Sequence, residues 1–174
     1  MLHALRDGTR LRIRPIAPDD GPRLAAAMRT LSPESARRRF LAPKPSLSAH
    51  ELRYLTAVDG VDHLALVAVT DDDRIVGVAR CVRGAPGDDE AEFAIVIGDA
   101  QQRQGLGTAL TQALADAACR VGIRRFTATT LAENTAVEAL LAGVATALEE
   151  RSADGGVREL AARLRDCGAA PIAA

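Results

Sequence analysis

Residues Ala91–Leu110 read AEFAIVIGDAQQRQGLGTAL, which is an apolar β run, a glycine-containing loop and the start of a helix. Gly105 and Gly107 remove side chains from the loop, so that a ligand can approach the backbone closely. The first N–H groups of a helix lack internal partners and carry the positive end of its dipole. Arg103 adds a full positive charge. This unit therefore predicts a phosphate or pyrophosphate site.

The segments on either side predict a mostly antiparallel sheet with helices packed on it. Three β runs joined by turns of three to six residues read as a meander that ends in the loop. Helix starts are marked by Ser32-Pro33 and by the Ser48/Glu51 capping box. We therefore expect one α+β domain. The expected strands are 11–16, 63–70, 74–83, 90–97 and 126–130, and the expected helices are 18–31, 32–40, 48–57, 106–122 and 134–141.

The C-terminal stretch allows two interpretations. Residues 157–165 have helical propensity, and periodicity alone favours a helix there. The same residues also alternate, with Leu160, Ala162 and Leu164 on one face. Residues 146–152 can form a preceding strand, and Asp154-Gly155-Gly156 is a strong hairpin turn. We expect the ordered core to span about residues 5–165 and residues 166–174 to form a flexible tail.

Composition excludes several classes of protein. The chain has 174 residues, 48% of them hydrophobic, and a net charge of −1, which suits one soluble domain. Its 22 basic residues are spread along the chain and offset by 23 acidic ones, and aromatic residues are few, so we expect no nucleic-acid partner. Neither a long apolar run nor an N-terminal signal is visible, so we expect no membrane partner and a cytoplasmic location. The three cysteines lie too far apart for a zinc site, and we expect no metal.

The spacing of the loop residues distinguishes it from other phosphate-binding loops. The dinucleotide fingerprint requires a third glycine where Leu110 stands. The Walker loop requires a lysine after its last glycine, and the only lysine is Lys44. What remains is Gln102-x-x-Gly105-x-Gly107, which resembles the acetyl-CoA pyrophosphate loop of the GNAT superfamily of N-acetyltransferases.

The GNAT resemblance implies a fold and a set of ligand-binding residues. It favours the C-terminal hairpin over the helix, in a mixed, mostly antiparallel sheet of six to seven strands flanked by helices. In this family the strand before the loop presents free N–H groups to the acyl end of the ligand. An asparagine that opens the next helix contacts another part of it. The implied acetyl-CoA-binding residues are Ile95, Ile97, Gln102, Arg103, Gln104, Gly105, Leu106, Gly107, Thr108 and Asn134.

The resemblance is closest to the acetyltransferase domain of bacterial Pat-type protein lysine acetyltransferases. It implies that residues 1–174 form a single acetyltransferase domain, acting as a monomer or weak homodimer on a protein lysine. A small-molecule amine acceptor and a non-catalytic acyl-CoA-binding module remain alternatives. The matching segments are Leu5-Arg6-Asp7-Gly8, Ile13-Arg14-Pro15-Ile16, Asp19-Asp20, Leu31-Ser32-Pro33-Glu34-Ser35, Arg39-Phe40, Val58-Asp59, Asp62-His63 and Ala91-Glu92-Phe93-Ala94.

Acetyl transfer to an amine requires a base. The pKa of a lysine amine near 10.4 makes the neutral form cost roughly 4.6 kcal/mol at pH 7. The resemblance assigns the base to Glu92, and Glu90, on the same strand face, is the runner-up. Leu141 stands where many GNAT enzymes carry a tyrosine, so no general acid is assigned. The run Arg37–Arg39 is expected to be a solvated helix face, with a ligand-phosphate contact or acidic recognition as alternatives.

Overall fold

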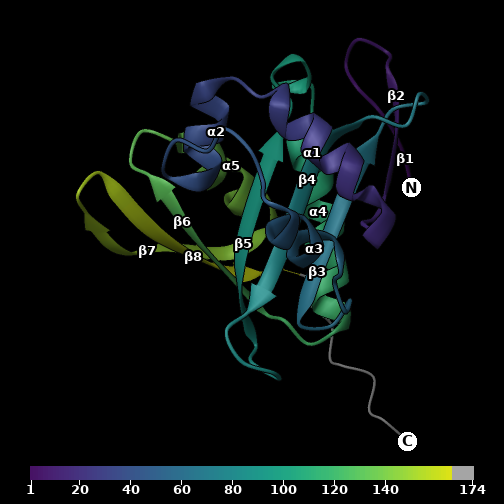
Figure 1. Cartoon of the computed structure of the whole chain (residues 1–174). Helices are drawn as coiled ribbons and strands as arrows, with labels where there is room; N and C mark the ends of the chain where they lie inside the picture. The colour runs from purple at the N-terminus through teal and green to yellow at the C-terminus, as the bar shows by residue number, and fades with distance from the viewer. Residues whose placement is uncertain (166–174) are drawn as a thin grey trace, which may run out of the picture.

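One eight-stranded sheet forms the centre of the computed structural model, which describes residues 1–165 (Figure 1). The strand order is β1-β2-β3-β4-β5-β6-β8-β7, and every neighbouring pair is antiparallel except β5 and β6. The expected α+β class is confirmed. The strands are β1 (Leu2–Ala4), β2 (Arg10–Pro15), β3 (His63–Val69), β4 (Ile75–Arg83), β5 (Glu90–Ile97), β6 (Arg125–Leu131), β7 (Ala145–Asp154) and β8 (Val157–Leu164).

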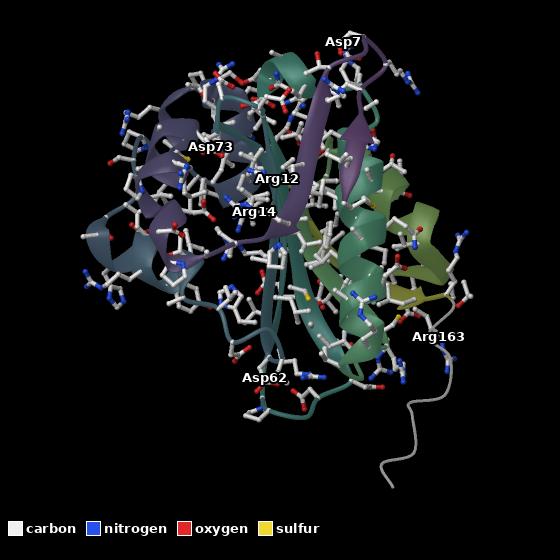
Figure 2. The ribbon with its side chains drawn as sticks, turned by 90° about the vertical axis from the view of Figure 1, so that its right-hand side faces the viewer. Asp7, Arg12, Arg14, Asp62, Asp73 and Arg163 are labelled. Atoms are coloured by element: carbon white, nitrogen blue, oxygen red, sulfur yellow. The ribbon has the colours of Figure 1, made fainter. Side chains whose placement is uncertain are left out.

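Helices cover both faces of the sheet, as the view along its β1–β2 edge shows (Figure 2). On one face, α4 (Leu106–Arg120) and α5 (Thr135–Val144) enclose the larger core, in which Phe93 and Phe126 stack with ring centroids 5.4 Å apart. On the other face, α1 (Gly21–Arg29) and α3 (Ala49–Thr56) cover a smaller core, and α2 (Pro33–Phe40) contacts β5 and β6. Short 3₁₀ turns, η1 (Pro18–Asp20) and η2 (Asp99–Gln101), precede α1 and the loop before α4.

Local sequence signals set the helix ends. The Ser32 hydroxyl accepts from the N–H of Ser35, and Ser48 and Glu51 form the expected capping box. Gly122 follows α4 with φ +89°, and the N–H of Ile123 folds back to the carbonyl of Ala118. No helix within residues 1–165 has the length and apolar character needed to cross a bilayer.

The C-terminal residues form the hairpin that the resemblance favoured. Asp154 of β7 pairs with Val157 of β8, and Gly155 and Gly156 between them have φ of +57° and +80°. A two-residue turn of this kind requires positive φ at both positions. β8 also pairs along its whole length with β6 and buries Leu160 in the core. Pairing on both edges outweighs the helical propensity of this segment, and the helix interpretation is wrong.

The sheet has eight strands, so the expectation of six to seven was low. The missing strand is β1, whose three residues are too few to show an alternating pattern. It is held by its ladder with β2 and by the N-terminal ammonium group, which donates to the carbonyl of Ile13 at 2.8 Å. The tail expected at residues 166–174 lies outside the described residues.

Candidate functional site

Strand β5 separates from β6 after three residue pairs. The parallel ladder begins at Glu90 and ends where Glu92 faces Thr127. Beyond Glu92, β5 pairs only with β4 in the described chain, and the N–H of Gly98 donates to the carbonyl of Val76 on that side. Because N–H directions alternate along an antiparallel strand, the N–H groups of Ile95 and Ile97 point to the side that β6 has left. This side of β5 is therefore an open strand edge.

The loop after β5 presents the N-terminus of α4 to the same opening. Gly105 is the N-cap with φ +93°, and Arg103 also has a positive φ of +59°. No side chain caps the helix, and the first main-chain bond runs from Ala109 N–H to Gly105 O at 3.1 Å. The preceding N–H groups at the start of α4 are thus available to an anion, in the positive end of the helix dipole.

The open edge of β5 and the start of α4 line a cavity of about 360 Å³ with α2 and α5. Gln104 and Leu106 are absent from its lining, and Leu106 is fully buried in the core, so only its main chain can serve a ligand. The structure brings the other residues of the predicted acetyl-CoA site together around the cavity: Ile95, Ile97, Gln102, Arg103, Gly105, Gly107, Thr108 and Asn134.

The Gln102 side chain holds the loop in place. Its Nε2 donates to the Ser35 hydroxyl at 2.9 Å and to the carbonyl of Ile97 at 3.1 Å. The neighbouring Asp99 carboxylate accepts from the Ser35 hydroxyl at 2.6 Å and from the Ser32 N–H and hydroxyl at 2.8 Å. These bonds join α2 to the loop. Sequence reasoning missed Ser32, Ser35 and Asp99, because no local pattern links residues so far apart in the chain.

Gly105, at the N-cap of α4, and Gly107, in the first turn of α4, are needed for different physical reasons. Gly105 adopts a backbone conformation that L side chains rarely take. At Gly107 a Cβ would lie 3.3 Å from Leu140 Cδ2, so this glycine lets α5 pack closely on α4. Gly107 therefore supports helix packing besides lining the cavity.

Asn134 stands at the start of α5 but does not cap it. Its side chain makes no cap hydrogen bond, although the residue is the N-cap and only 7% exposed. Asn134 lines the first cavity instead. Leu141, at the position where relatives of the predicted family often carry tyrosine, is fully buried in the core.

Glu90 and Glu92 line a second cavity, of about 390 Å³, together with Tyr54. The Glu90 carboxylate accepts two hydrogen bonds from Arg151, at 2.6 and 3.0 Å, which lower its pKa. Glu92 is exposed and makes no hydrogen bond or ion pair within residues 1–165. Of the two carboxylates, Glu92 is therefore the one without an ion-pair partner among the described residues.

The arginine run divides between surface and site. Arg37 and Arg38 are exposed and pair with Glu133 and Glu34, and Arg38 also lines the first cavity. Arg39 instead turns inward, lies over the Phe40 ring at 5.0 Å and lines both cavities. Burial lowers the pKa of its guanidinium, and the charge of Glu92 opposes that shift. The expectation of a solvated face holds for Arg37 and Arg38 and is wrong for Arg39.

Cys81 and His63 do not form a cysteine–histidine nucleophile. Cys81 is fully buried among apolar residues, and burial raises the pKa of its thiol to about 12. His63 pairs with Val82, next to Cys81, so the two side chains lie on opposite faces of the sheet. Within residues 1–165 no group of three or more His, Cys, Asp or Glu side chains is arranged to hold a metal ion.

Similarity to known proteins agrees with this geometry. Residues 10–144 match the family described as acetyltransferase (GNAT) domain. Acetyltransferase Pat of Mycolicibacterium smegmatis is 33% identical over 138 residues, which are 79% of this chain and 41% of that protein. An acetyltransferase of Pseudomonas aeruginosa is 32% identical over 146 residues, covering 80% of this chain and 76% of that protein. The chain thus spans less than half the length of the first of these relatives.

Solved structures show the same fold. The GNAT domain of S. lividans PAT superposes with a TM-score of 0.84 at 35% identity, over 94% of this chain and 96% of that one. A cAMP-binding acyltransferase from Mycobacterium smegmatis superposes with a TM-score of 0.68 at 25% identity, over 99% of this chain and 49% of that one. With the family match over most of its length, the open strand edge and the loop that follows it, the chain belongs to the GNAT family of acetyltransferases.

Proposed function

We propose that this chain transfers an acetyl group from acetyl-CoA to a primary amine, with a protein lysine as the leading acceptor. The observation that carries the proposal is the divergence of β5 from β6 at Glu92, with the start of α4 at the end of the opening. An extended ligand can pair with the free strand edge while its phosphates meet the helix N-terminus. Acetyl-CoA has both parts.

Each wall of the first cavity has a distinct task in this proposal. The N–H groups of Ile95 and Ile97 bind the pantetheine arm and polarise the acetyl carbonyl. The start of α4, with Arg103 and Thr108, binds the pyrophosphate. Asn134 binds the pantetheine arm or the adenosine end through its uncapped amide. Gln102 acts through the loop that it holds.

Glu92 is proposed as the general base. It removes one proton from the acceptor ammonium, directly or through water, so that the neutral nitrogen attacks the acetyl carbonyl. The C–N bond forms, the C–S bond breaks and the nitrogen loses its second proton to water, while the CoA thiolate takes up one proton from water, so that the net proton released is the one that Glu92 removed. The buried Leu141 supplies no proton for this last step.

The charge of the second cavity does not by itself select among amine acceptors. Arg39, Arg80 and Arg83 line it together with Asp88, Glu90 and Glu92, and the ammonium group of a lysine is as positive as those of a polyamine. A protein lysine is the acceptor that the resemblance to Pat-type protein lysine acetyltransferases implies, and Acetyltransferase Pat is among the relatives of the chain. We further propose that the chain acts in the cytoplasm as a monomer or weak homodimer.

The test is release of free thiol from acetyl-CoA by the purified chain. The acceptors are a panel of bacterial acyl-CoA synthetases, polyamines and amino acids, and the variants are Glu92→Gln and its matched control Glu90→Gln. The proposal predicts that Glu92→Gln lowers kcat about 10²- to 10³-fold while calorimetry shows unchanged acetyl-CoA affinity. Glu90→Gln should retain most of the turnover, because its carboxylate is occupied by Arg151.

Each other outcome identifies a different function. Glu92-dependent release with small amines alone would replace the protein lysine by a small acceptor. Acetyl-CoA binding without release from any acceptor would favour the non-catalytic acyl-CoA-binding module. Failure to bind acetyl-CoA would refute the assignment of the first cavity.

A further inference from the structure

Arg39 and Arg80 line the second cavity, the proposed site of the acceptor, and form no ion pair within residues 1–165. Arg80 of β4 is 6% exposed, and its Nη1 lies 3.0 Å from His63 Nε2 while its Nη2 donates to the carbonyl of Leu55 at 3.2 Å. Arg39 of α2 donates no hydrogen bond within residues 1–165 and rests on the Phe40 ring. Neither residue takes part in any ion pair in the described part of the chain. Both guanidinium groups thus lack a directly bound carboxylate in the described residues, although the charge of Glu92 acts on Arg39.

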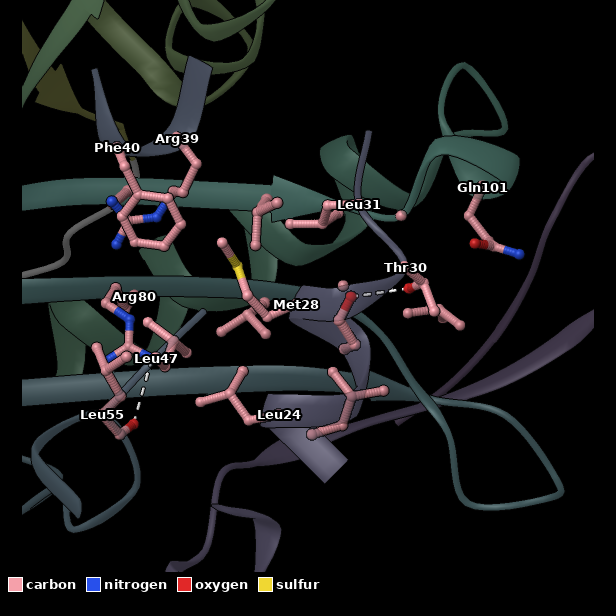
Figure 3. Close-up of a pocket in the computed structure, with 18 residues that line it drawn as sticks. Leu24, Met28, Thr30, Leu31, Arg39, Phe40, Leu47, Leu55, Arg80 and Gln101 are labelled. Carbon is pink, nitrogen blue, oxygen red and sulfur yellow. Dashed lines mark hydrogen bonds between the residues drawn. The ribbon is translucent and has the colours of Figure 1, made fainter. Parts of the chain in front are cut away.

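The two guanidinium groups are neighbours. Figure 3 shows Arg39 and Arg80 at the same end of a small apolar pocket that α1 closes with Leu24 and Met28. Both arginines also line the cavity that holds Glu92. Burial and the nearby charge of Arg39 lower the pKa of Arg80 to about 10. Arg39 and Arg80 therefore form part of the wall between the apolar pocket and Glu92, the proposed base.

Arg83, another buried arginine that lines the second cavity, has the carboxylate partner that Arg39 and Arg80 lack. Arg83 has only 4% of its side chain exposed, but its Nη1 forms a 2.7 Å ion pair with Asp62. Its remaining donors bind the carbonyls of Val61, Asp88 and Val121. A buried charge is stabilised by such partners, and a pair of like charges without them is costly. Arg39 and Arg80 have an incomplete set of partners by this standard.

The two guanidinium groups without ion pairs indicate a small anion as the missing partner. Arg39 and Arg80 contribute two positive charges, and Glu92 and Asp88, which line the same cavity, contribute two negative charges. Glu90 is already paired with Arg151. Because the cavity carries no excess positive charge, a singly charged carboxylate suits it better than a phosphate dianion. Guanidinium groups also bind carboxylates through paired, parallel hydrogen bonds.

We propose that Arg39 and Arg80 bind a carboxylate of the acceptor, close to the amine that reacts at Glu92. This inference rests on the proposed function and narrows its substrate class to amines that carry a nearby carboxylate. In a protein the carboxylate belongs to an Asp or Glu side chain beside the target lysine. In a free amino acid it is the α-carboxylate.

The experiment compares acceptors that differ only in this carboxylate. One arm uses lysine peptides with Glu or Gln beside the lysine, and the other uses free lysine and its amide. Wild-type protein should prefer the carboxylate-bearing member of at least one pair by about 10- to 100-fold in kcat/KM. The arm in which the preference occurs identifies the source of the carboxylate.

The variant Arg80→Lys keeps the charge but loses the planar fork. Because Arg80 does not line the first cavity, acetyl-CoA affinity should stay unchanged while the preference falls below about threefold. Arg74→Lys is the matched control, since Arg74 is exposed and pairs with Asp72 away from the cavity. It should retain the full preference.

A measurement on wild-type protein protects the test against a variant that fails to fold. Glutarate, which has carboxylates and no amine, should bind in the presence of CoA and inhibit competitively against the acceptor. Equal use of both members of each pair, or no glutarate binding, would overturn the inference. In that case Glu92-dependent transfer would still uphold the proposed function, and lost acetyl-CoA binding would refute it separately.

Discussion

Asp99 accepts a 2.6 Å hydrogen bond from the hydroxyl of Ser35 across 64 residues of chain. Although burial opposes it, the bonds from Ser35 and Ser32 together lower the pKa of the Asp99 carboxyl. Since Ser35 also accepts from Gln102, the loop before α4 depends on α2 for its position. We expect Ser35→Ala to weaken acetyl-CoA binding about 3- to 10-fold and to cost about 1 kcal/mol of stability. Calorimetric titration and urea unfolding measure the two effects.

The control for this prediction is Ser152→Ala in the exposed strand β7, which should change neither quantity. Unchanged acetyl-CoA affinity in Ser35→Ala would show that the loop holds its shape without α2.

Asn134→Ala separates a capping role from a ligand role. Loss of a helix cap costs about 1 kcal/mol, but the Asn134 side chain makes no cap bond. We therefore expect less than about 0.5 kcal/mol of destabilisation, with a rise of roughly tenfold in the KM for acetyl-CoA. Ser48→Ala, which removes a working cap from α3, should show the reverse pattern. A destabilised Asn134→Ala protein with normal KM would contradict the ligand role.

Gly105→Ala and Gly143→Ala should change stability in opposite directions. Gly105 has φ +93°, so an alanine there is strained and should cost about 1 to 2 kcal/mol. Gly143 lies within α5 with open space around its Cα, so alanine should stabilise the helix by about 0.5 to 1 kcal/mol. Urea unfolding of both variants measures the difference. Stabilisation of both would mean that Gly105 does not keep its positive φ.

His63 should make stability depend on pH between about 4 and 6.5. Burial and the adjacent Arg80 lower the pKa of His63 from 6.5 to about 4. As pH falls below 6.5, the unfolded chain binds a proton that the folded chain excludes, so stability decreases until the folded His63 also titrates near pH 4. The loss should reach at most about 3 kcal/mol. In urea unfolding from pH 7 to 4, His63→Gln should lack this part of the slope, and an identical slope would contradict the assignment.

The strand, loop and helix around the first cavity could be predicted from sequence because their signals are local. Gly105 and Gly107 mark the loop, and apolar spacing marks α4. The hairpin of β7 and β8 was harder, because its strand residues also suit a helix. There the family resemblance and the Gly155-Gly156 turn gave the correct interpretation.

What could not be predicted depends on contacts between distant segments. The role of Asp99 follows from where α2 packs, and β1 is too short for a pattern. Arg39 is an intermediate case, because helical spacing places it on the face of Ser35 and Ala36, both buried. Its separation from Arg37 and Arg38 also requires knowing that Ser35 and Ala36 are buried, which only the packing of α2 shows.

The ladder between β5 and β6 has only three residue pairs, and this weak connection within the sheet is called the seam below. Seven pairs join β4 to β5 and seven join β6 to β8, so β1–β5 and β6–β8 are each better connected within themselves than to one another. A ligand that occupies the opening beside Ile95 bridges the seam and binds only the folded chain. Its binding free energy adds to stability by mass action, about 2.7 kcal/mol at 100 times its Kd. The free energy of unfolding of the protein is therefore coupled to the concentration of the acetyl-CoA that it is proposed to bind.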